Sequence, residues 1–372
     1  MLIGVPKEIK ADEYRVALIP ATITELVARG HRVEVQSHAG DEAGLSDGEY
    51  AAAGAQIVTT ADPIFQHAEL IVKVKEPLSS ERRKLQRGQM IFTYLHLAAD
   101  REQTDALLAS GVTAIAYETV TDKAGKLPLL APMSKVAGRM APQVAAHFLE
   151  RPHGGRGILL GGVDLLPSAK VVVLGGGVVG CSAAEIAIGM GADVTVVTRS
   201  AATVQHVSQL FGGHVHALAA DQKIIDTLCS CADVVIGAAL VAGAKAPKLV
   251  SARTVAGMNP GAVIVDVSID QGGCAETSRP TTHSQPVYMV NGVVHYCVAN
   301  MPGAVPRTST FALNNATRPY ILALADRGFP RALVEDVHLR NGLNVHDGKI
   351  TCSAVADALQ LPYTPAADVL GV

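Results

Sequence analysis

A glycine-rich turn between an apolar run and a helical segment constrains the fold of this chain more than any other stretch. The run Lys170–Leu174 consists largely of β-branched residues, which is typical of a buried parallel strand. Glycines of the pattern G-x-G-x-x-G follow at Gly175, Gly177 and Gly180. We expect the first to allow a tight turn, the second to let a pyrophosphate approach the backbone, and the third to let helix and strand pack closely.

The segments after the turn predict a dinucleotide-binding unit. A helix is expected over Cys181–Met190, ended by the glycines around it, and a second strand over Asp193–Thr198. The first N–H groups of such a helix lack partners within the helix and can bind phosphate oxygens. A glycine turn can also serve packing alone, but the order strand, turn, helix and strand favours dinucleotide binding.

Length and composition exclude several classes of protein. A length of 372 residues suggests two domains, and 49% hydrophobic with 17% charged residues is typical of a well-buried α/β protein. A net charge of −3 argues against a nucleic-acid surface. The longest uncharged apolar stretch, near residues 234–244, is about half a membrane span, and the N-terminus lacks the features of a secretion signal. Six scattered cysteines fit reduced thiols in a cytoplasm. No metal site is predicted, because Cys229 and Cys231 lack a second ligand pair.

Strands and helices alternate along the chain, which predicts two parallel sheets. Before the glycine turn we expect the strands Leu2–Val5, His31–Ser37, Leu70–Lys75, Gln89–His96 and Val112–Tyr117, and the helices Pro20–Arg29 and Arg101–Ala109. A longer helix is expected from an N-cap at Ser134 to about Leu149, followed by a connector over Arg151–Ser168. After the turn we expect the strands Val215–Leu218, Ala232–Gly237, Ala262–Ile269 and Val293–Val298, and the helices Ala202–Phe211, Gln222–Cys229 and Ser309–Arg327.

These elements predict an α/β fold with two domains, one of them discontinuous in sequence. A Rossmann-type, doubly wound parallel sheet is expected over residues 131–305. The C-terminal tail is too short for a third domain, so we expect residues 306–372 to join residues 1–130 in a second α/β domain that binds substrate. A cleft between two sheets is a usual place for a substrate beside a cofactor.

Basic residues follow two of the predicted strands, at the ends where ligands bind in open α/β sheets. The guanidinium of Arg15 can bind a carboxylate through two hydrogen bonds, and a surface salt bridge with Glu8 or Glu13 is the alternative. Lys75 ends an apolar strand, where it is partly desolvated, and a solvated strand end is the alternative. Spacing alone does not separate Lys75 from Lys73.

A histidine and an aspartate end two further predicted strands. A neutral imidazole at His96 can give or take a proton near pH 7, as hydride chemistry on an alcohol or amine carbon requires; a buried, satisfied histidine is the alternative. Asp270 ends a strand of the cofactor sheet and is expected near a nicotinamide, although an aspartate before two glycines is also common in turns.

At these residues the chain resembles the bacterial L-alanine dehydrogenases, over essentially its whole length. The resemblance is carried by the motifs Gly4–Lys10, Lys73–Pro77, Tyr94–Ala98, Ala116–Val120, Val265–Val267 with Gln271–Gly273, Arg279–His283 and Asn300–Ala304. It implies reversible, NAD-dependent oxidative deamination of L-alanine to pyruvate and ammonium by a cytoplasmic homohexamer. It further implies that Arg15 and Lys75 bind the substrate carboxylate and oxo group, that His96 is the general acid/base, and that Asp270 is the second catalytic residue.

The resemblance and the glycine turn together imply a set of cofactor-binding residues. These are Ser134, Gly175, Gly177, Val178, Val179, Gly180, Thr198, Arg199, Ala239, Leu240, Val267, Ser268, Ile269, Asp270, Arg279, Val298, Ala299, Asn300 and Met301. One position departs from the family, which commonly ends the second strand of this domain with an aspartate that binds the ribose hydroxyls. Here Thr198 and Arg199 stand at that point, and an arginine beside hydroxyls can receive a 2′-phosphate, so NADP is possible although NAD is favoured.

Two other functions fit parts of the pattern. The nucleotide-binding component of a proton-translocating transhydrogenase resembles this fold but needs no amino-acid pocket, so Arg15, Lys75 and His96 favour the dehydrogenase. A saccharopine-type enzyme acting on a larger amino acid is disfavoured by the short chain, which leaves no room for an extra domain.

Overall fold

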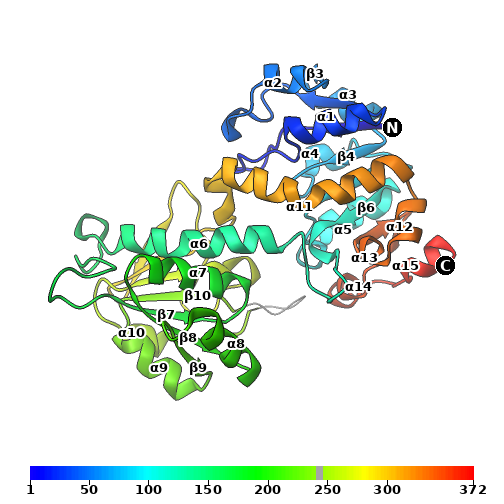
Figure 1. The fold of residues 1–372 in the computed structure, drawn as a ribbon. Helices are drawn as coiled ribbons and strands as arrows, with labels where there is room; N and C mark the ends of the chain where they lie inside the picture. Colours follow the sequence, from blue (N-terminus) through cyan, green and yellow to red (C-terminus); the bar gives the residue numbers. More distant parts are fainter. Residues whose placement is uncertain (240–245) are drawn as a thin grey trace. The chain divides into compact units, whose positions relative to one another are not determined.

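The computed structural model describes residues 1–239 and 246–372, which divide into two compact units (Figure 1). Unit 1 comprises Met1–Met133 and Gly303–Val372, and unit 2 comprises Ser134–Pro302. Unit 1 is therefore discontinuous in sequence. The predicted α/β class with two domains is confirmed.

Unit 1 is built on a mixed sheet of eight strands among the described residues. They are β1 (Leu2–Val5), β2 (Arg32–Gln36), β3 (Gln56–Val58), β4 (Leu70–Val72), β5 (Met90–Thr93), β6 (Thr113–Ala116), β14 (Leu343–His346) and β15 (Lys349–Ile350), in the order β15-β14-β6-β5-β4-β1-β2-β3. The first six of these strands run parallel to one another. The predicted parallel sheet is present and is extended by two antiparallel strands, because β14 pairs antiparallel with β6 and β15 with β14.

Helices cover both faces of this sheet, as a sheet made of near-continuous apolar strands requires. They are α1 (Pro20–Ala28), α2 (Asp47–Ala52), α3 (Asp62–His67), α4 (Ser79–Arg82), α5 (Arg101–Ser110), α11 (Pro306–Arg327), α12 (Arg331–Glu335), α13 (Val337–Arg340), α14 (Ser353–Leu359) and α15 (Ala366–Leu370). On one face, Ile71 and Ile91 pack with Phe65 of α3 and Leu107 of α5. The returning helix α11 is joined to α1 by a buried hydrogen bond from Thr22 Oγ1 to Asn314 Oδ1, at 2.7 Å.

Unit 2 contains a doubly wound sheet, which is also mixed. Its strands are β7 (Lys170–Leu174), β8 (Asp193–Thr198), β9 (His216–Ala219), β10 (Val234–Gly237), β11 (Val263–Asp266), β12 (Val287–Val290) and β13 (Val293–Tyr296), in the order β12-β13-β11-β10-β7-β8-β9. Only β12 is antiparallel among the described strands of this sheet. The chain winds outward from β7 through β8 to β9 and then restarts at β10, so the switch point lies between β7 and β10.

Alternate residues of the central strands face helices on opposite sides. The helices of unit 2 are α6 (Ala131–Phe148), which begins in the last residues of unit 1, α7 (Val178–Gly189), α8 (Ala201–Phe211), α9 (Gln222–Cys231) and α10 (Ala252–Ala256). Val171 and Val173 pack with alanines of α6 and α7. Val172 and Leu174 face the other side, with Ile225 of α9. Burial on both faces accounts for the unbroken apolar run.

Two predicted helix starts were wrong. Helix α7 begins at Val178, three residues earlier than expected, because Gly177 is already its N-cap and the third glycine lies inside the helix. Ser134 is not an N-cap, since α6 begins at Ala131 and contains Ser134 in its first turn. Pro132 lacks a backbone N–H, and N–H groups in the first turn of a helix have no partner within the helix. A proline is therefore compatible with that earlier start. Among the described residues, no helix is both long and apolar enough to span a membrane.

Candidate active site

In unit 1, the predicted substrate residues follow neighbouring strands at one edge of the sheet. Arg15 comes after β1, Lys75 after β4 and His96 after β5, and these strands lie side by side in the order β5-β4-β1. Because the strands are parallel, their carboxyl ends meet at the same edge. Glu118 follows β6, the next strand along, and lies beside His96.

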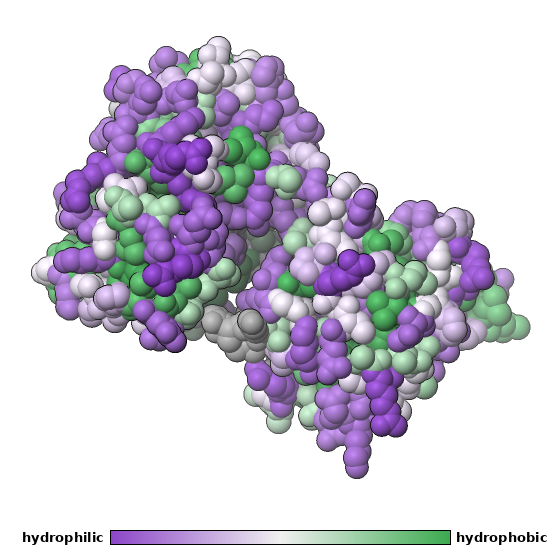
Figure 2. All heavy atoms as spheres, turned by 180° about the vertical axis from the view of Figure 1, so that it is seen from behind, coloured by the Kyte–Doolittle hydropathy of each residue, from purple (hydrophilic) through white to green (hydrophobic). Residues whose placement is uncertain are grey.

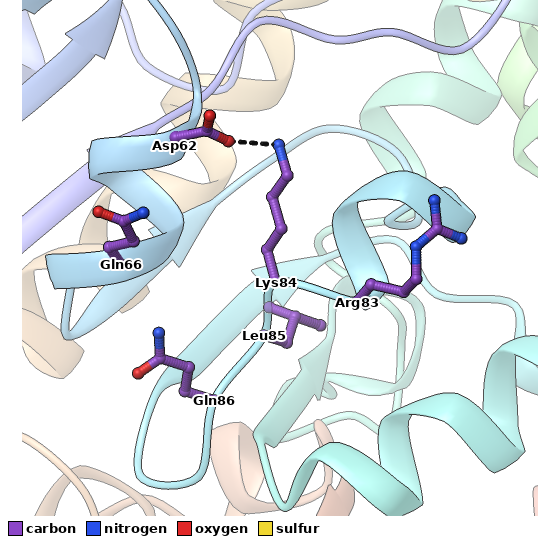
Figure 3. A pocket seen from close by; sticks show the side chains of 6 residues that line it. All are labelled: Asp62, Gln66, Arg83, Lys84, Leu85 and Gln86. Carbon is purple, nitrogen blue, oxygen red and sulfur yellow. Dashed lines mark hydrogen bonds and ion pairs between the residues drawn. The ribbon is translucent and has the colours of Figure 1, made fainter.

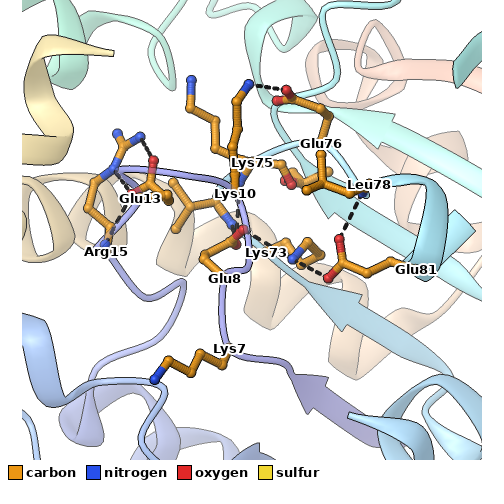
Figure 4. Close-up of polar contacts among 12 residues, drawn as sticks. Lys7, Glu8, Lys10, Glu13, Arg15, Lys73, Lys75, Glu76, Leu78 and Glu81 are labelled. Atoms are coloured by element: carbon orange, nitrogen blue, oxygen red, sulfur yellow. Dashed lines mark hydrogen bonds and ion pairs between the residues drawn. The ribbon is translucent and has the colours of Figure 1, made fainter. Parts of the chain in front are cut away.

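The Arg15 guanidinium is buried and already binds a carboxylate. Its Nε donates to Glu13 Oε1 at 2.6 Å, and a second guanidinium nitrogen pairs with the other oxygen of Glu13 (Figure 4). A third nitrogen lies 3.0 Å from the thioether sulfur of Met133. Burial alone would lower the pKa of Arg15, but the hydrogen bonds and charge of Glu13 outweigh it and raise that pKa. The alternative, a surface salt bridge, named the correct partner in Glu13, but the pair is buried and does not lie on the surface.

The structure separates the two lysines that spacing alone could not. Lys73 is fully buried, and its Nζ lies 3.1 Å from Glu8 Oε2 and 2.8 Å from Glu81 Oε1. Burial alone would lower the pKa of Lys73, but the two carboxylates raise it. Lys73 is therefore a charged structural group inside unit 1, held between its two acidic partners (Figure 4).

Lys75 is half-buried, and its backbone is fixed by the same region of the sheet. Its N–H donates to Glu8 Oε1 at 3.3 Å, and its carbonyl accepts a hydrogen bond from Thr93 Oγ1 at 2.8 Å. Nearby, Lys10 pairs with Glu76 (Figure 4). Strand β4 ends at Val72 and not at Lys75 as expected, and the Glu8 carboxylate takes the N–H groups of Val74 and Lys75 beyond it.

His96 lies in a loop and not at the end of a strand, which corrects the prediction. Strand β5 ends at Thr93, and His96 adopts the left-handed backbone conformation with φ +52°. Its side chain is 50% exposed and lies parallel to the ring of Tyr94, with centroids 5.8 Å apart. The Tyr94 hydroxyl donates to Leu129 O at 2.6 Å, which holds that ring in place. The exposed imidazole can reach a ligand, unlike the buried histidine of the alternative.

In unit 2, the three glycines of the turn have three different surroundings. Gly175 has φ +124°, and a Cβ there would overlap the carbonyl oxygen of Ala238. A Cβ on Gly180 would overlap the carbonyl oxygen of Gly175, so helix and strand pack closely here. A Cβ on Gly177 would meet no described atom within 4 Å. Packing among the described residues therefore does not require glycine at 177, whereas backbone approach by a pyrophosphate does.

Most of the other predicted cofactor residues lie at the carboxyl ends of the parallel strands of unit 2. Thr198 ends β8 and is buried, and the exposed Arg199 follows it. Ala239 follows β10, and Leu240 lies outside the described residues. Segments after the last two parallel strands hold Val267, Ser268, Ile269 and Asp270 (after β11) and Val298, Ala299, Asn300 and Met301 (after β13). The structure thus brings these segments and the glycine turn to one edge of the sheet.

The remaining three groups of cofactor residues lie on helices and a loop. Val178 and Val179 form the start of α7, directly after the glycine turn. Ser134 lies one turn before Gly138, where α6 packs against the carbonyl of Val179. Arg279 is exposed and its guanidinium carbon lies 4.1 Å from the ring centroid of Tyr288.

Asp270 does not end a strand, which corrects the prediction, and the acid that does was missed. Strand β11 ends at Asp266, and Asp270 is exposed in the 3₁₀ turn Val267–Gln271 that follows. The buried Asp266 carboxylate accepts hydrogen bonds from Ser278 Oγ at 2.6 Å and from Cys274 N at 2.8 Å. It also accepts from Ser268 N at 3.1 Å, so it orders the loop that carries the predicted cofactor residues. The sequence signal for Asp266 was an acidic residue directly after the three β-branched residues 263–265.

A surface hollow of unit 1 is lined by none of the residues predicted for the site. It is lined by Asp62, Gln66, Arg83, Lys84, Leu85 and Gln86 (Figure 3). An exposed ion pair between Lys84 and Asp62, at 2.5 Å, crosses it. None of the residues predicted for substrate or cofactor lines this hollow, and its mostly exposed polar side chains are typical of a solvated surface.

Taken together, the two units define a two-domain α/β protein. Unit 2 has a dinucleotide-binding type of sheet, and in unit 1 an arginine, a lysine and a histidine follow adjacent strands. Residues 4–137 match the family model "Alanine dehydrogenase/PNT, N-terminal domain", and residues 141–353 match "Alanine dehydrogenase/PNT, C-terminal domain". The chain belongs to the alanine dehydrogenase/PNT family.

Full-length relatives agree with this assignment. The chain is 55% identical to the alanine dehydrogenase of Mycolicibacterium smegmatis, over 100% of both chains, and 50% identical to that of Bacillus subtilis, over 100% of this chain and 98% of the relative. A solved L-alanine dehydrogenase superposes with a TM-score of 0.93 at 50% identity, covering 97% of this chain and 99% of the other. A transhydrogenase from Sinorhizobium meliloti superposes with a TM-score of 0.81 at 24% identity, over 95% of this chain and 100% of the other, which shows a shared fold.

Proposed function

We propose that this chain is an NAD-dependent alanine dehydrogenase. It converts L-alanine, NAD⁺ and water to pyruvate, ammonium, NADH and a proton, and it runs the reverse amination. The observation that supports this most is the placement of Arg15, Lys75 and His96 after adjacent parallel strands. The chain that carries them is 50–55% identical, over its full length, to alanine dehydrogenases.

Arg15 binds the carboxylate of the substrate, and Lys75 binds the oxo group when the substrate is pyruvate. Arg15 shows in its pair with Glu13 that its guanidinium binds a carboxylate through two nitrogens. The nitrogen that contacts the Met133 sulfur faces a weak acceptor, and a substrate carboxylate oxygen is a stronger one. Lys75 binds the oxo group of pyruvate. Fixing the alanine α-carbon in this way removes translational and rotational freedom before the chemical step.

His96 moves the protons of the reaction. NAD⁺ held by unit 2 would supply the acceptor for the hydride that leaves the α-carbon of alanine, and loss of that hydride turns the substrate amine into an iminium. Water attacks the iminium carbon while the His96 imidazole takes a proton from that water. The imidazolium returns the proton to the amine nitrogen, and ammonia departs as the hydroxyl gives up its proton and the carbonyl of pyruvate forms. Asp270 positions the reacting group or the water. A positioned acid/base of this kind typically contributes roughly 100- to 10,000-fold in rate.

The residues of unit 2 fit a dinucleotide. The open side of Gly177 and the N-terminus of the twelve-residue helix α7 provide room and N–H donors for a pyrophosphate. The family resemblance favours NAD as the cofactor. Thr198 and Arg199 place a hydroxyl and a guanidinium at the end of β8, so NADP is also admitted there.

A homohexamer in the cytoplasm is the setting we propose. The segment between α6 and β7 carries exposed apolar side chains at Leu159, Leu165 and Leu166, a composition suited to contact with further copies of the chain. Hydrophobic side chains also appear in green on the face shown in Figure 2. All six cysteines are free thiols, as in a reducing compartment.

Alanine-dependent NADH formation by the isolated chain tests the proposal. We expect turnover with L-alanine and NAD⁺, and the reverse reaction with pyruvate, ammonium and NADH. Glycine, serine and longer amino acids, run in parallel, measure what the pocket admits. Tight NADH binding without any turnover would instead support the transhydrogenase-like hydride-transfer module, the alternative function that the shared fold allows.

A further inference from the structure

Two histidines and a glutamate come together at the end of helix α6, in unit 2, and none of the three is among the residues assigned above. Candidate ligand atoms of His147, Glu150 and His153 all lie within 4.8 Å of one another. The Nε2 atom of His153 and Oε2 of Glu150 are 3.7 Å apart. All three side chains are reachable from solvent, and none has a role in the proposed dehydrogenase reaction.

The backbone explains why residues three apart in sequence converge. Helix α6 ends at Phe148, and the Glu150 N–H donates to His147 O at 3.2 Å. The chain then takes an extended conformation at Glu150 and turns into the 3₁₀ segment Arg151–His153, where His153 N donates to Glu150 O at 3.1 Å. These two successive bonds span three residues each, so the turn carries His153 back towards His147.

The two imidazole rings rest on an anchored aromatic side chain. Their centroids are 3.9 Å apart, and Phe148 meets His147 at 4.9 Å and His153 at 5.8 Å. Phe148 is buried in the core of unit 2, where its ring lies 5.8 Å from that of Tyr296. Both histidines are therefore held near their positions by a residue that cannot move freely, which lowers the cost of arranging ligands around an ion.

We propose that His147, Glu150 and His153 form a binding site for a divalent transition-metal cation of the Zn²⁺ type. Two imidazole nitrogens and a carboxylate oxygen are the donors such ions prefer, with water completing a tetrahedral shell. Ligand atoms on tetrahedral zinc lie about 3.3 Å apart, given bonds of about 2.0–2.1 Å. The 3.7 Å separation of His153 and Glu150 closes to that value by a small side-chain rotation. Mg²⁺ and Ca²⁺ are disfavoured, because they require mainly oxygen ligands.

Zinc titration of the full chain tests the site without any reference to turnover. The chain, without an affinity tag and stripped with EDTA, competes with a chromophoric chelator for Zn²⁺. We expect one zinc ion per chain whose affinity falls at least about tenfold in the double variant His147→Gln/His153→Gln. The double variant His214→Gln/His216→Gln, which removes two exposed histidines elsewhere in unit 2, and Cys231→Ser are the matched controls and retain that affinity.

Three results would overturn the site: equal zinc affinity in the His147→Gln/His153→Gln variant, an equal loss in the controls, or zinc located only elsewhere in a crystal by its anomalous scattering. Circular dichroism verifies that the double variant is folded. If it is not, the single variant Glu150→Gln removes one ligand from an exposed turn and is expected to weaken zinc binding in the same direction.

Discussion

The carboxylate of Glu118 holds the backbone of His96. Oxygen Oε1 of Glu118 accepts the His96 N–H at 2.6 Å and lies 3.8 Å from Nδ1 of the same residue. The Glu118 carboxylate also accepts the N–H of Leu95, at 3.2 Å from each oxygen. His96 occupies the left-handed region, which is uncommon for a residue with a Cβ, so this arrangement needs such support. Glu118 is therefore a positioning residue for the proposed acid/base.

Replacing Glu118 by alanine should lower kcat while leaving the affinity for the cofactor nearly unchanged. The N–H groups of Leu95 and His96 would lose their acceptor, and the imidazole would sample other positions. We expect a loss smaller than that of His96→Ala, which removes the whole contribution of roughly 100- to 10,000-fold. Steady-state kinetics with alanine and with pyruvate measure both effects.

Glu118→Gln keeps one acceptor oxygen and should recover part of the lost kcat. Glu102→Gln, on the exposed surface of α5, removes only an ion pair with Arg82 and is the matched control. A Glu118→Ala enzyme with an unaltered kcat would show that His96 is positioned by other groups.

Replacing Arg15 by alanine should chiefly raise the KM for alanine and for pyruvate. Without the guanidinium, the substrate carboxylate loses its charged partner, and Glu13 remains as a buried carboxylate without one of its hydrogen-bond donors. Arg15→Lys should recover little, because a single ammonium cannot make the two parallel bonds. An unchanged KM in Arg15→Ala would remove this residue from carboxylate binding.

Lys73 and Lys75, two residues apart, should respond to substitution in opposite ways. Lys73→Met leaves Glu8 and Glu81 buried without their cation, which costs roughly 3–5 kcal/mol of stability. Lys75→Met should lower kcat/KM for pyruvate and alter the urea unfolding midpoint far less. Urea denaturation and kinetics on both variants separate the two roles. A fully stable but inactive Lys73→Met would reverse our assignment.

Sequence patterns located most elements of the fold because burial on both faces of a parallel sheet leaves unbroken apolar runs. The ends of three strands were placed too late for one shared reason. A carboxylate takes N–H groups that follow each strand. Glu8 and Glu118, which come from other segments, do so beyond β4 and β5, and Asp266, the last residue of β11, accepts the N–H of Ser268 beyond its own strand. Such long-range partners leave no local pattern, so Lys75, His96 and Asp270 were predicted as strand ends and lie in loops.

In the candidate site too, features set by local sequence were predicted, and features set by contacts between distant segments were not. The glycine spacing indicated the turn, and the close approach of Gly180 to the carbonyl oxygen of Gly175 is a constraint within that spacing. Burial of the Lys73 ammonium depends instead on Glu8 and Glu81, which no spacing rule connects to it. The antiparallel strands β14 and β15 were also missed, since the C-terminal tail that holds them is only weakly patterned.

Acidification should destabilise unit 2 through His295. Burial lowers the pKa of His295 from its ordinary value of 6.5, and its ring is satisfied while neutral, with Nδ1 3.0 Å from Val293 O and Nε2 2.8 Å from Thr277 Oγ1. Below about pH 6.5 the unfolded chain takes up the proton first, so the stability present above that pH is lost as pH falls towards the lowered folded pKa.

Urea unfolding midpoints measured from about pH 7.5 to about pH 5.5, on either side of the ordinary histidine pKa, report this effect. His295→Gln should unfold more easily at every pH, yet with a shallower dependence on pH. His216→Gln, at an exposed position of β9, should keep the wild-type slope. A slope that is identical in His295→Gln and in the wild type would assign the acid sensitivity to other groups.

The choice between NAD and NADP should depend on the end of strand β8. Thr198 is buried there and Arg199 is exposed beside it, without the carboxylate that would bind ribose hydroxyls and repel a 2′-phosphate. We expect a higher kcat/KM with NAD⁺ than with NADP⁺, but measurable turnover with both. Arg199→Ala should reduce the NADP⁺ reaction more than the NAD⁺ reaction, because only the former loses a charge partner. Adding the acid with Arg199→Asp should suppress the NADP⁺ reaction further. A wild-type preference for NADP⁺ would reverse the proposed order, and equal losses in Arg199→Ala would show that this guanidinium does not contact the ribose.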